Sequence, residues 1–419
     1  MKMTMINRAG VIGIVGLAVA AATASLVSGD EPIVTALRSE VLRAAGVVVL
    51  ADHAVGPDGH LIDDAVLVVD ARGRIREFGS AAELGYGEGE PRRSGGREVI
   101  ELPDGAVLCP GLVAVGSELW VSGGNYEQTK SIDPSLSVIE AFDGSQSSVV
   151  DALKAGITST MVIPRPNNVV CGTAAVLKTW PCGPETGSLP GDRVLRDDGP
   201  VVLALGPSTW DFAGEPTSRA GALALIRREF DSAKDADGDD EASVRMRQLV
   251  SGELDSIVWA AEVEDVQAVV RVLMPRGVNP VVFHGGNPLE CGAWLKETGK
   301  PVVLGPLGFG SGPGQLYGPA ALSQSGVEIA FAGQMPVAAP DSLRISAALA
   351  ARYGMDAAAA RRAITSVPAA VAGVSDRVGS FAPGLDADFV VFSGDPISLS
   401  SSVLEVWVNG TRVMPGAIE

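Results

Sequence analysis

The chain has 419 residues, of which 46% are hydrophobic and 20% charged, and its formal net charge is −18 at pH 7. A chain of this length can bury large cores and normally forms more than one domain. Such an acidic surface repels phosphate backbones, so we expect no nucleic-acid partner.

The first 24 residues have the pattern of an export signal. A basic start with Lys2 and Arg8 precedes an uncharged stretch over 9–29, and Ala22-Thr23-Ala24 is a small-x-small cleavage pattern. Because the uncharged stretch is long for a signal peptide, an uncleaved membrane anchor is the alternative. Both interpretations place the folded part outside the cytoplasm, as a periplasmic or secreted protein. A membrane contact is expected only if the segment is uncleaved.

Short strands are expected near both ends of the chain, because apolar runs there alternate with turn residues. The expected strands cover 45–50, 65–70, 74–78, 388–392 and 404–408. Asn409-Gly410 follows the last of them and predicts a type I′ hairpin turn.

Between these ends, apolar runs alternate with Ala- and Arg-rich stretches of helical character. The runs cover 160–164, 201–205, 257–260, 280–283, 301–304 and 327–331. Alternation of strand and helix predicts an α/β fold with a parallel sheet and, at this length, a (β/α)8 TIM barrel. The Gly- and Pro-rich segment 305–318 is expected to form a loop at the barrel mouth, as a lid or as filler.

Three segments resemble motifs of the amidohydrolase superfamily. Residues 109–120 read Cys-Pro-Gly-Leu-Val-Ala-Val-Gly-Ser-Glu-Leu-Trp, where the superfamily has Pro-Gly-Leu-Ile-Asp-x-His-x-His on its first barrel strand. Residues 152–160 are similar to the family's entry into the second strand, and 352–392 resembles its imidazolonepropionase-like and dipeptidase-like branch. The resemblance implies a metal-dependent hydrolase barrel over 111–375. It also implies a small composite β-sandwich from 25–110 and 376–419.

Position by position, the resemblance implies that most of the family's metal ligands are substituted. The substituted positions are Gly116 and Glu118 on the first strand, Trp259 and Ala261 on the fifth, and Gln334 at the aspartate of the eighth. An amide has no proton-accepting state near neutral pH, so Gln334 cannot replace a catalytic base. His284 stands at the sixth-strand histidine. The chain holds three histidines in all, which excludes a site built from four.

Two functions remain open. In the first, the protein is an exported pseudoenzyme without a cofactor, and its barrel mouth binds a small molecule, a peptide or a partner. In the second, it hydrolyses carbon–nitrogen bonds with zinc or iron held by His284 together with Glu118, Glu262 or Glu264. We favour the first, because losing metal ligands and base together forfeits water activation and proton transfer. His284 is then a hydrogen-bonded barrel histidine. A second copy of the chain or an active paralogue is a further candidate partner.

The four cysteines form no C-x-x-C motif. Cys171 and Cys182 flank a strand-like segment over 174–180 and could form a local disulfide, although sequence leaves the pairing open. Cys109 is expected to pack as a small apolar residue at the base of the first barrel strand.

Overall fold

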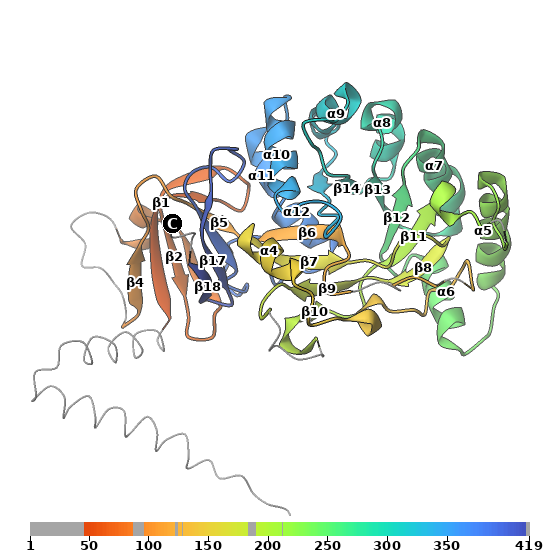
Figure 1. Cartoon of the computed structure of the whole chain (residues 1–419), viewed down its shortest axis with the longest axis horizontal. Helices are drawn as coiled ribbons and strands as arrows, with labels where there is room; N and C mark the ends of the chain where they lie inside the picture. Colours follow the sequence, from red (N-terminus) through yellow and green to blue (C-terminus); the bar gives the residue numbers. More distant parts are fainter. Residues whose placement is uncertain are drawn as a thin grey trace, which may run out of the picture.

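The computed structural model describes residues 46–86, 96–121, 125–127, 129–182, 190–211 and 213–415. The expected export signal over 1–24 lies outside these ranges. Within them, no helix combines the length and the hydropathy needed to cross a membrane. Figure 1 shows a smaller, sheet-rich part beside a larger α/β part.

The smaller part is one eight-stranded sheet that contains strands from both ends of the described chain. The strands are β1 (Val47–Val55), β2 (Leu61–Val69), β3 (Ile75–Ser80), β4 (Glu98–Glu101), β5 (Val107–Pro110), β16 (Phe389–Phe392), β17 (Val403–Val408) and β18 (Thr411–Pro415). Their order is β18-β17-β16-β5-β1-β2-β3, with β4 paired to β1. The antiparallel pairing of β16 with β5 joins the two ends of the chain. Side chains from both wings, such as Leu67 and Phe389, share one core, so the sheet folds over itself like a sandwich.

The turn between β17 and β18 has the backbone that its sequence predicts. Asn409 and Gly410 have φ angles of 50° and 69°. A type I′ turn requires positive φ at both central residues, which Asn and Gly adopt more easily than other residues.

The larger part is a ring of strands covered by helices. Its parallel strands are β6 (Leu112–Ser117), β7 (Ile157–Val162), β11 (Val201–Leu205), β12 (Ser256–Ala260), β13 (Pro280–His284), β14 (Val302–Leu304) and β15 (Ile329–Phe331). Each of β11 to β14 pairs in parallel with the next strand along the chain, as β6 does with β7. A parallel bridge between Val115 and Ala332 connects β6 to the end of β15. The expected α/β class is confirmed.

One place in the ring departs from the expected eight parallel strands. Between β7 and β11 lie β8 (Val170–Thr173), antiparallel to β11, and β9 (Ala175–Lys178), antiparallel to β7. On its other side β9 pairs with β10 (Val194–Arg196). The strand beside β7 is β9, and the connection between them contains β8 but no helix. A parallel neighbour needs a crossover of a dozen or more residues, usually a helix, so here the chain runs back antiparallel to β7.

Helices lie outside the ring, and Figure 1 shows α7 to α10 in an arc beside β12 to β14. The longer helices are α4 (Ser148–Lys154), α5 (Arg219–Ala233), α6 (Glu241–Ser251), α7 (Val263–Ala268), α8 (Pro288–Glu297), α9 (Pro313–Gln324), α10 (Ser342–Arg352), α11 (Ala357–Arg362) and α12 (Ser366–Val371). Short turns of helix are α3 (Ala81–Leu84), η1 (Val138–Ala141), η2 (Gly191–Arg193), η3 (Pro207–Thr209), η4 (Val269–Leu273) and η5 (Met274–Arg276).

The segment 305–318 is a loop only in its first half. Helix α9 begins at Pro313, although the sequence predicted that the loop continues to residue 318. Proline suits the first helical position because its fixed φ matches the helix and its missing N–H would have no partner there. The side chain of Gln315 also accepts a hydrogen bond from the N–H of Gly312 at 3.2 Å, which caps the helix.

A buried network of charges joins the ring to the sheet. The Nζ of Lys178, on β9, lies 2.7 Å from Asp386 Oδ2 and 2.9 Å from Asp388 Oδ2. Arg74 and Arg377 also pair with Asp386. Burial alone would raise the pKa of Asp386, but the hydrogen bond from Arg377 and the charge of Lys178 outweigh it and lower that pKa. Burial raises the pKa of Asp388 despite the opposing charge of Lys178.

Candidate functional site

The carboxyl ends of the parallel strands form the mouth of the ring, where enzymes of this architecture place their active sites. At the mouth, Gly116 has a φ of 74°. A Cβ added to this residue would lie 2.3 Å from Cε1 of Phe283. Both the left-handed backbone and the neighbouring ring therefore oppose any side chain at position 116.

An aromatic pair lies beside Gly116, inside the ring. The rings of Trp259 and Phe283 have centroids 4.3 Å apart and an interplanar angle of 38°. Both side chains pack with the inner apolar cluster of the ring, whereas their neighbours Ala260 and Val282 belong to the outer cluster beneath the helices. Trp259 thus points inward and is half-buried. The pair brings apolar surface to the place where a metal site would need polar donors.

Glu118 is held in an ion pair at the mouth. Arg165, from the loop after β7, donates from Nη2 to Glu118 Oε2 at 2.9 Å and from Nε to Oε1 at 3.3 Å. The hydrogen bond to Glu118 raises the pKa of Arg165. The guanidinium also lies over the ring of Tyr126, 5.4 Å from its centroid. The carboxylate of Glu118 is therefore neutralised by a cation within the chain.

His284 faces the helices rather than the inside of the ring. Because side chains alternate along a strand and Phe283 points inward, His284 points outward. Its Nδ1 lies 2.7 Å from the carbonyl oxygen of Ala260, which can only accept, so Nδ1 carries the proton. Its Nε2 lies 3.5 Å from Sγ of Cys291 on α8. Burial lowers the pKa of His284 and raises that of Cys291 to about 12.

The remaining candidate carboxylates belong to the start of α7. Glu262 precedes that helix and pairs with Arg219, while Glu264 is exposed on its first turn. Arg219 also donates to the fully buried Asp265 at 2.9 Å. The candidate carboxylates therefore have different partners in different parts of the ring. The structure does not bring Glu118, Glu262, Glu264 and His284 together around one point.

The residues at these positions do not fit a catalytic zinc or iron. Such a metal needs several imidazole or carboxylate donors that converge, with one position open for water. Gly116 and Ala261 offer no donor, and Trp259 offers an indole that cannot ligate. Gln334 is half-buried with a φ of 45°. No group of three or more His, Cys, Asp or Glu side chains suited to a metal occurs within the described ranges.

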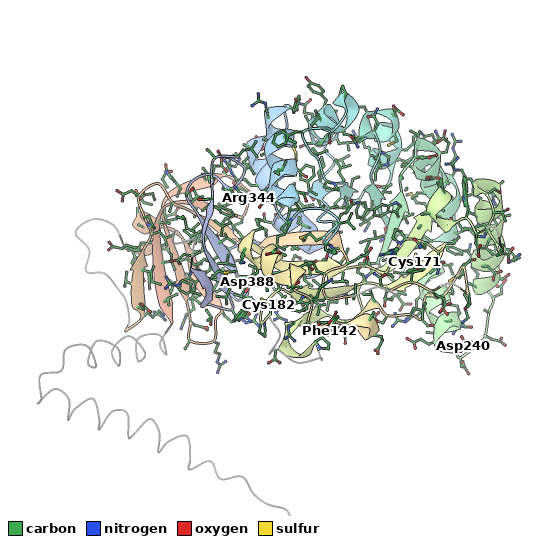
Figure 2. The ribbon with its side chains drawn as sticks, viewed as in Figure 1. Phe142, Cys171, Cys182, Asp240, Arg344 and Asp388 are labelled. Carbon is green, nitrogen blue, oxygen red and sulfur yellow. The ribbon has the colours of Figure 1, made fainter. Side chains whose placement is uncertain are left out.

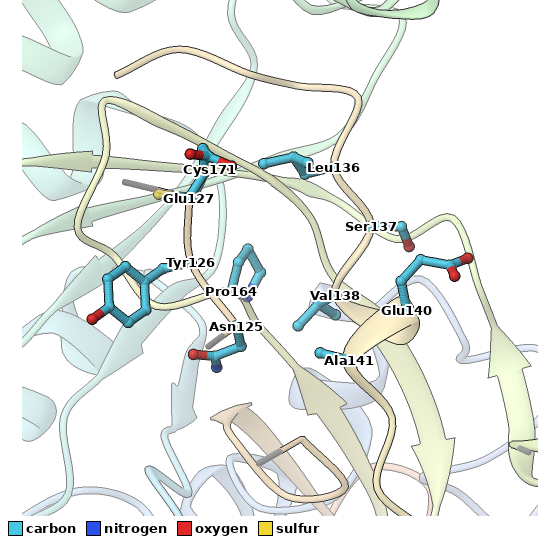
Figure 3. A pocket seen from close by; sticks show the side chains of 10 residues that line it. All are labelled: Asn125, Tyr126, Glu127, Leu136, Ser137, Val138, Glu140, Ala141, Pro164 and Cys171. Atoms are coloured by element: carbon cyan, nitrogen blue, oxygen red, sulfur yellow. The ribbon is translucent and has the colours of Figure 1, made fainter. Parts of the chain in front are cut away.

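A pocket of about 450 Å³ lies beside the mouth, near the carboxyl end of β7, and Figure 3 shows the residues that line it. Pro164 follows β7 and Cys171 lies on β8, and residues 136–141 form the facing wall. Asn125 lines this pocket and is 7% exposed, yet neither its Oδ1 nor its Nδ2 has a hydrogen-bond partner among the described residues. A buried polar group without a partner costs about 1–3 kcal/mol. Sequence reasoning missed both Asn125 and Arg165, because neither occupies a position of the motifs that carried the resemblance.

All four cysteines are free thiols. The disulfide considered between Cys171 and Cys182 is not formed. Cys171 packs in the inner cluster and donates to the carbonyl oxygen of Asn168 at 3.0 Å, whereas Cys182 lies beyond the far end of β9, well apart in Figure 2. Cys109 is fully buried, and burial raises its pKa.

Comparisons with known proteins agree with this architecture. A model described as the Amidohydrolase family matches residues 309–413. The amidohydrolase tasK of Hapsidospora irregularis is 31% identical over 90 residues, which are 22% of this chain and 9% of that protein. The chain thus spans a small part of that relative's length.

Solved structures cover more of the chain. An amidohydrolase from Thermotoga maritima MSB8 is 25% identical with a TM-score of 0.73, over 88% of this chain and 100% of that one. A β-aspartyl dipeptidase from Fervidobacterium islandicum AW-1 is 14% identical with a TM-score of 0.52, over 88% and 98%. Molinate hydrolase is 14% identical with a TM-score of 0.53, over 88% and 95%. At 14% identity, the likeness to the dipeptidase and to molinate hydrolase is one of fold.

Proposed function

Because this chain is an amidohydrolase-family protein, we propose that it is a non-catalytic member whose barrel mouth binds a small molecule, a peptide or a partner without hydrolysing it. The observation that carries the proposal is the contact at Gly116. A Cβ at this position would lie 2.3 Å from the ring of Phe283, so the structure around it leaves no room for an imidazole.

Two further features support a binding role. Trp259 presents aromatic surface inside the ring, where it packs on the fully buried Phe283, and the paired Glu118 and Arg165 present fixed polar groups at its rim. Ligand pockets commonly combine apolar walls with a few well-placed polar groups.

The alternative is a hydrolase with an unorthodox metal site, and the placement of its candidate residues does not favour it. His284 would have to turn from Ala260 and Cys291 toward the inside of the ring. Glu118 would have to release Arg165. Both changes break existing hydrogen bonds before any metal is held.

Metal content and turnover test the proposal together. Full-length protein is loaded with zinc, iron or manganese, dialysed, and analysed for bound metal. It is then assayed on a dipeptide and on a β-aspartyl dipeptide. We expect less than one equivalent of metal per chain and no turnover above the buffer rate. A full equivalent that survives dialysis and is lost in His284→Ala would overturn the proposal, as would metal-dependent hydrolysis.

We also propose that the protein is exported. The support is the basic start, uncharged stretch and Ala22-Thr23-Ala24 pattern of residues 1–24. Cell fractionation with N-terminal sequencing should find a chain that begins near Ser25 outside the cytoplasm. A chain that keeps Met1 and stays in the membrane would support the anchor instead, and a cytoplasmic chain would contradict export. Size measurement of the same sample shows whether a second copy or another protein accompanies it.

A further inference from the structure

The pocket beside the mouth is a candidate ligand site separate from the positions that replace the family's metal ligands. It lies between the loop that contains Asn125 and the facing segment of Val138 and Glu140, as Figure 3 shows. Its volume of about 450 Å³ is within the range of about 300–1,000 Å³ that is usual for small-molecule sites. None of its described lining residues is Gly116, Glu118, Trp259, Ala261 or Gln334.

The side-chain amide of Asn125 brings an unsatisfied hydrogen-bond donor and acceptor to the pocket. The side chain is more than nine-tenths buried, and both its donor and its acceptor lack a partner among the described residues. Buried amides in folded proteins are nearly always satisfied by protein, ordered water or ligand. A bound group that offers both a donor and an acceptor would satisfy Asn125.

The charge of the pocket selects the kind of ligand. Two carboxylates, Glu127 and Glu140, line it, and its described lining residues include no Lys, Arg or His. Glu127 is fixed by hydrogen bonds to its Oε1 from the N–H and the hydroxyl of Thr129, both at 2.6 Å. Glu140 is exposed on the short turn η1. The net charge of −18 adds a long-range attraction for cations.

We propose that this pocket binds a small organic cation of the amidine, guanidine or amine class. Its charged end lies near Glu140, its hydrogen-bonding groups meet Asn125, and its apolar body packs on Val138 and Pro164. The site goes beyond the proposed function, because it holds whether or not the ring mouth is catalytic.

Three probes of nearly the same shape test the charge preference. Benzamidinium is a cation, benzamide is neutral and benzoate is an anion, so differences among them report charge rather than size. Dissociation constants for full-length protein are measured by ligand-observed NMR titration. We expect benzamidinium to bind about tenfold more tightly than benzamide, and benzoate to bind least. Equal affinities, or no binding of any probe because water alone fills the pocket, would overturn the proposal.

Two variants and a control locate the binding. Asn125→Leu keeps the size of the side chain while removing both hydrogen-bonding groups, and Glu140→Gln removes one charge at an exposed position. Each variant should weaken the binding of benzamidinium about tenfold. Glu140→Gln should also reduce the difference in affinity between benzamidinium and benzamide. Glu297→Gln, at an exposed position on α8, should leave all three affinities unchanged. Benzamidinium binding that neither Asn125→Leu nor Glu140→Gln alters would place the site elsewhere and refute the inference.

Discussion

Replacing Lys178 with methionine should strongly destabilise the protein, because it leaves buried carboxylates without their shared cation. The side chain of Lys178 is 2% exposed, and those of Asp386 and Asp388 are 1% exposed. Breaking a buried ion pair by removing one partner costs about 3–5 kcal/mol. Asp386 keeps Arg74 and Arg377, while Asp388 keeps a hydrogen bond from the Asn409 N–H at 2.8 Å. We therefore expect a loss near the lower bound, about 3 kcal/mol.

Urea unfolding of full-length protein measures this loss, with Lys154→Met as the control. Lys154 is 60% exposed and its Nζ lies 4.0 Å from Asp151, so its removal should cost no more than about 0.5 kcal/mol. The double variant Lys178→Met with Asp388→Asn also removes the uncompensated charge of Asp388. Its free energy of unfolding should be about 1 kcal/mol or more above that of Lys178→Met alone.

The pH dependence separates charge from packing in this prediction. Without Lys178, the already raised pKa of Asp388 rises further, so the folded state binds a proton at pH values where the unfolded carboxyl is ionised. The free energy of unfolding of Lys178→Met then falls as pH rises above about 3.9. Its loss relative to wild type should therefore be larger at pH 8 than at pH 5. A deficit that equals that of Lys154→Met, or that is the same at both pH values, would refute the reasoning.

Three other predictions follow from the ring and the sheet. Gly116→Ala should lose about 3 kcal/mol in urea unfolding, because its Cβ meets Phe283 and its φ is positive, whereas Gly310→Ala, with open space around it, should lose little. Burial lowers the pKa of His284, so below about pH 6.5 the unfolded state binds more protons than the folded state. The free energy of unfolding of the wild type should therefore fall, relative to that of His284→Gln, by up to about 1.4 kcal/mol per pH unit below about pH 6.5. If the free energies of unfolding of the two proteins changed in parallel with pH, this prediction would be contradicted. Deleting the chain after Gly384 removes β16 to β18 and exposes the edge of β5, so the truncated protein should aggregate, and a soluble product with the full-length melting temperature would show that the sheet does not need them.

The sequence predicted the strands well, because runs of apolar residues at strand length have few other stable arrangements. The expected run 201–205 coincides with β11, and 280–283 falls within β13. The direction of β8 and β9 was not predicted, because strand direction depends on the length of the connection rather than on the apolar residues of the strand. The alternation of apolar runs and helical stretches also did not show that a helix begins at Pro313, because the residues around it are mostly of types found in loops.

For the candidate site, the sequence predicted which residue types occupy the family's positions but not where each side chain points. The resemblance places His284 at a metal-ligand position, yet its side chain faces Cys291 on α8, because the strand places Phe283 on the inner side. The resemblance also places Glu118 at a ligand position, but its partner Arg165 comes from a different loop. Such pairings depend on which loops meet in space, and a single sequence does not contain that information directly.

The junction of β5 with β16 also imposes an order in time on the newly made chain. Residues 111–388 separate the two strands, and at about 5–20 residues per second this stretch takes roughly 15–55 s to synthesise. A hairpin such as β1–β2 forms in about 1–10 μs, so the N-terminal strands can pair long before the last partner of β5 exists. During that interval the outer edge of β5 is open to any other extended segment, including that of a neighbouring nascent chain. A chaperone that binds extended chains would protect the protein most during this interval, before β16 is synthesised.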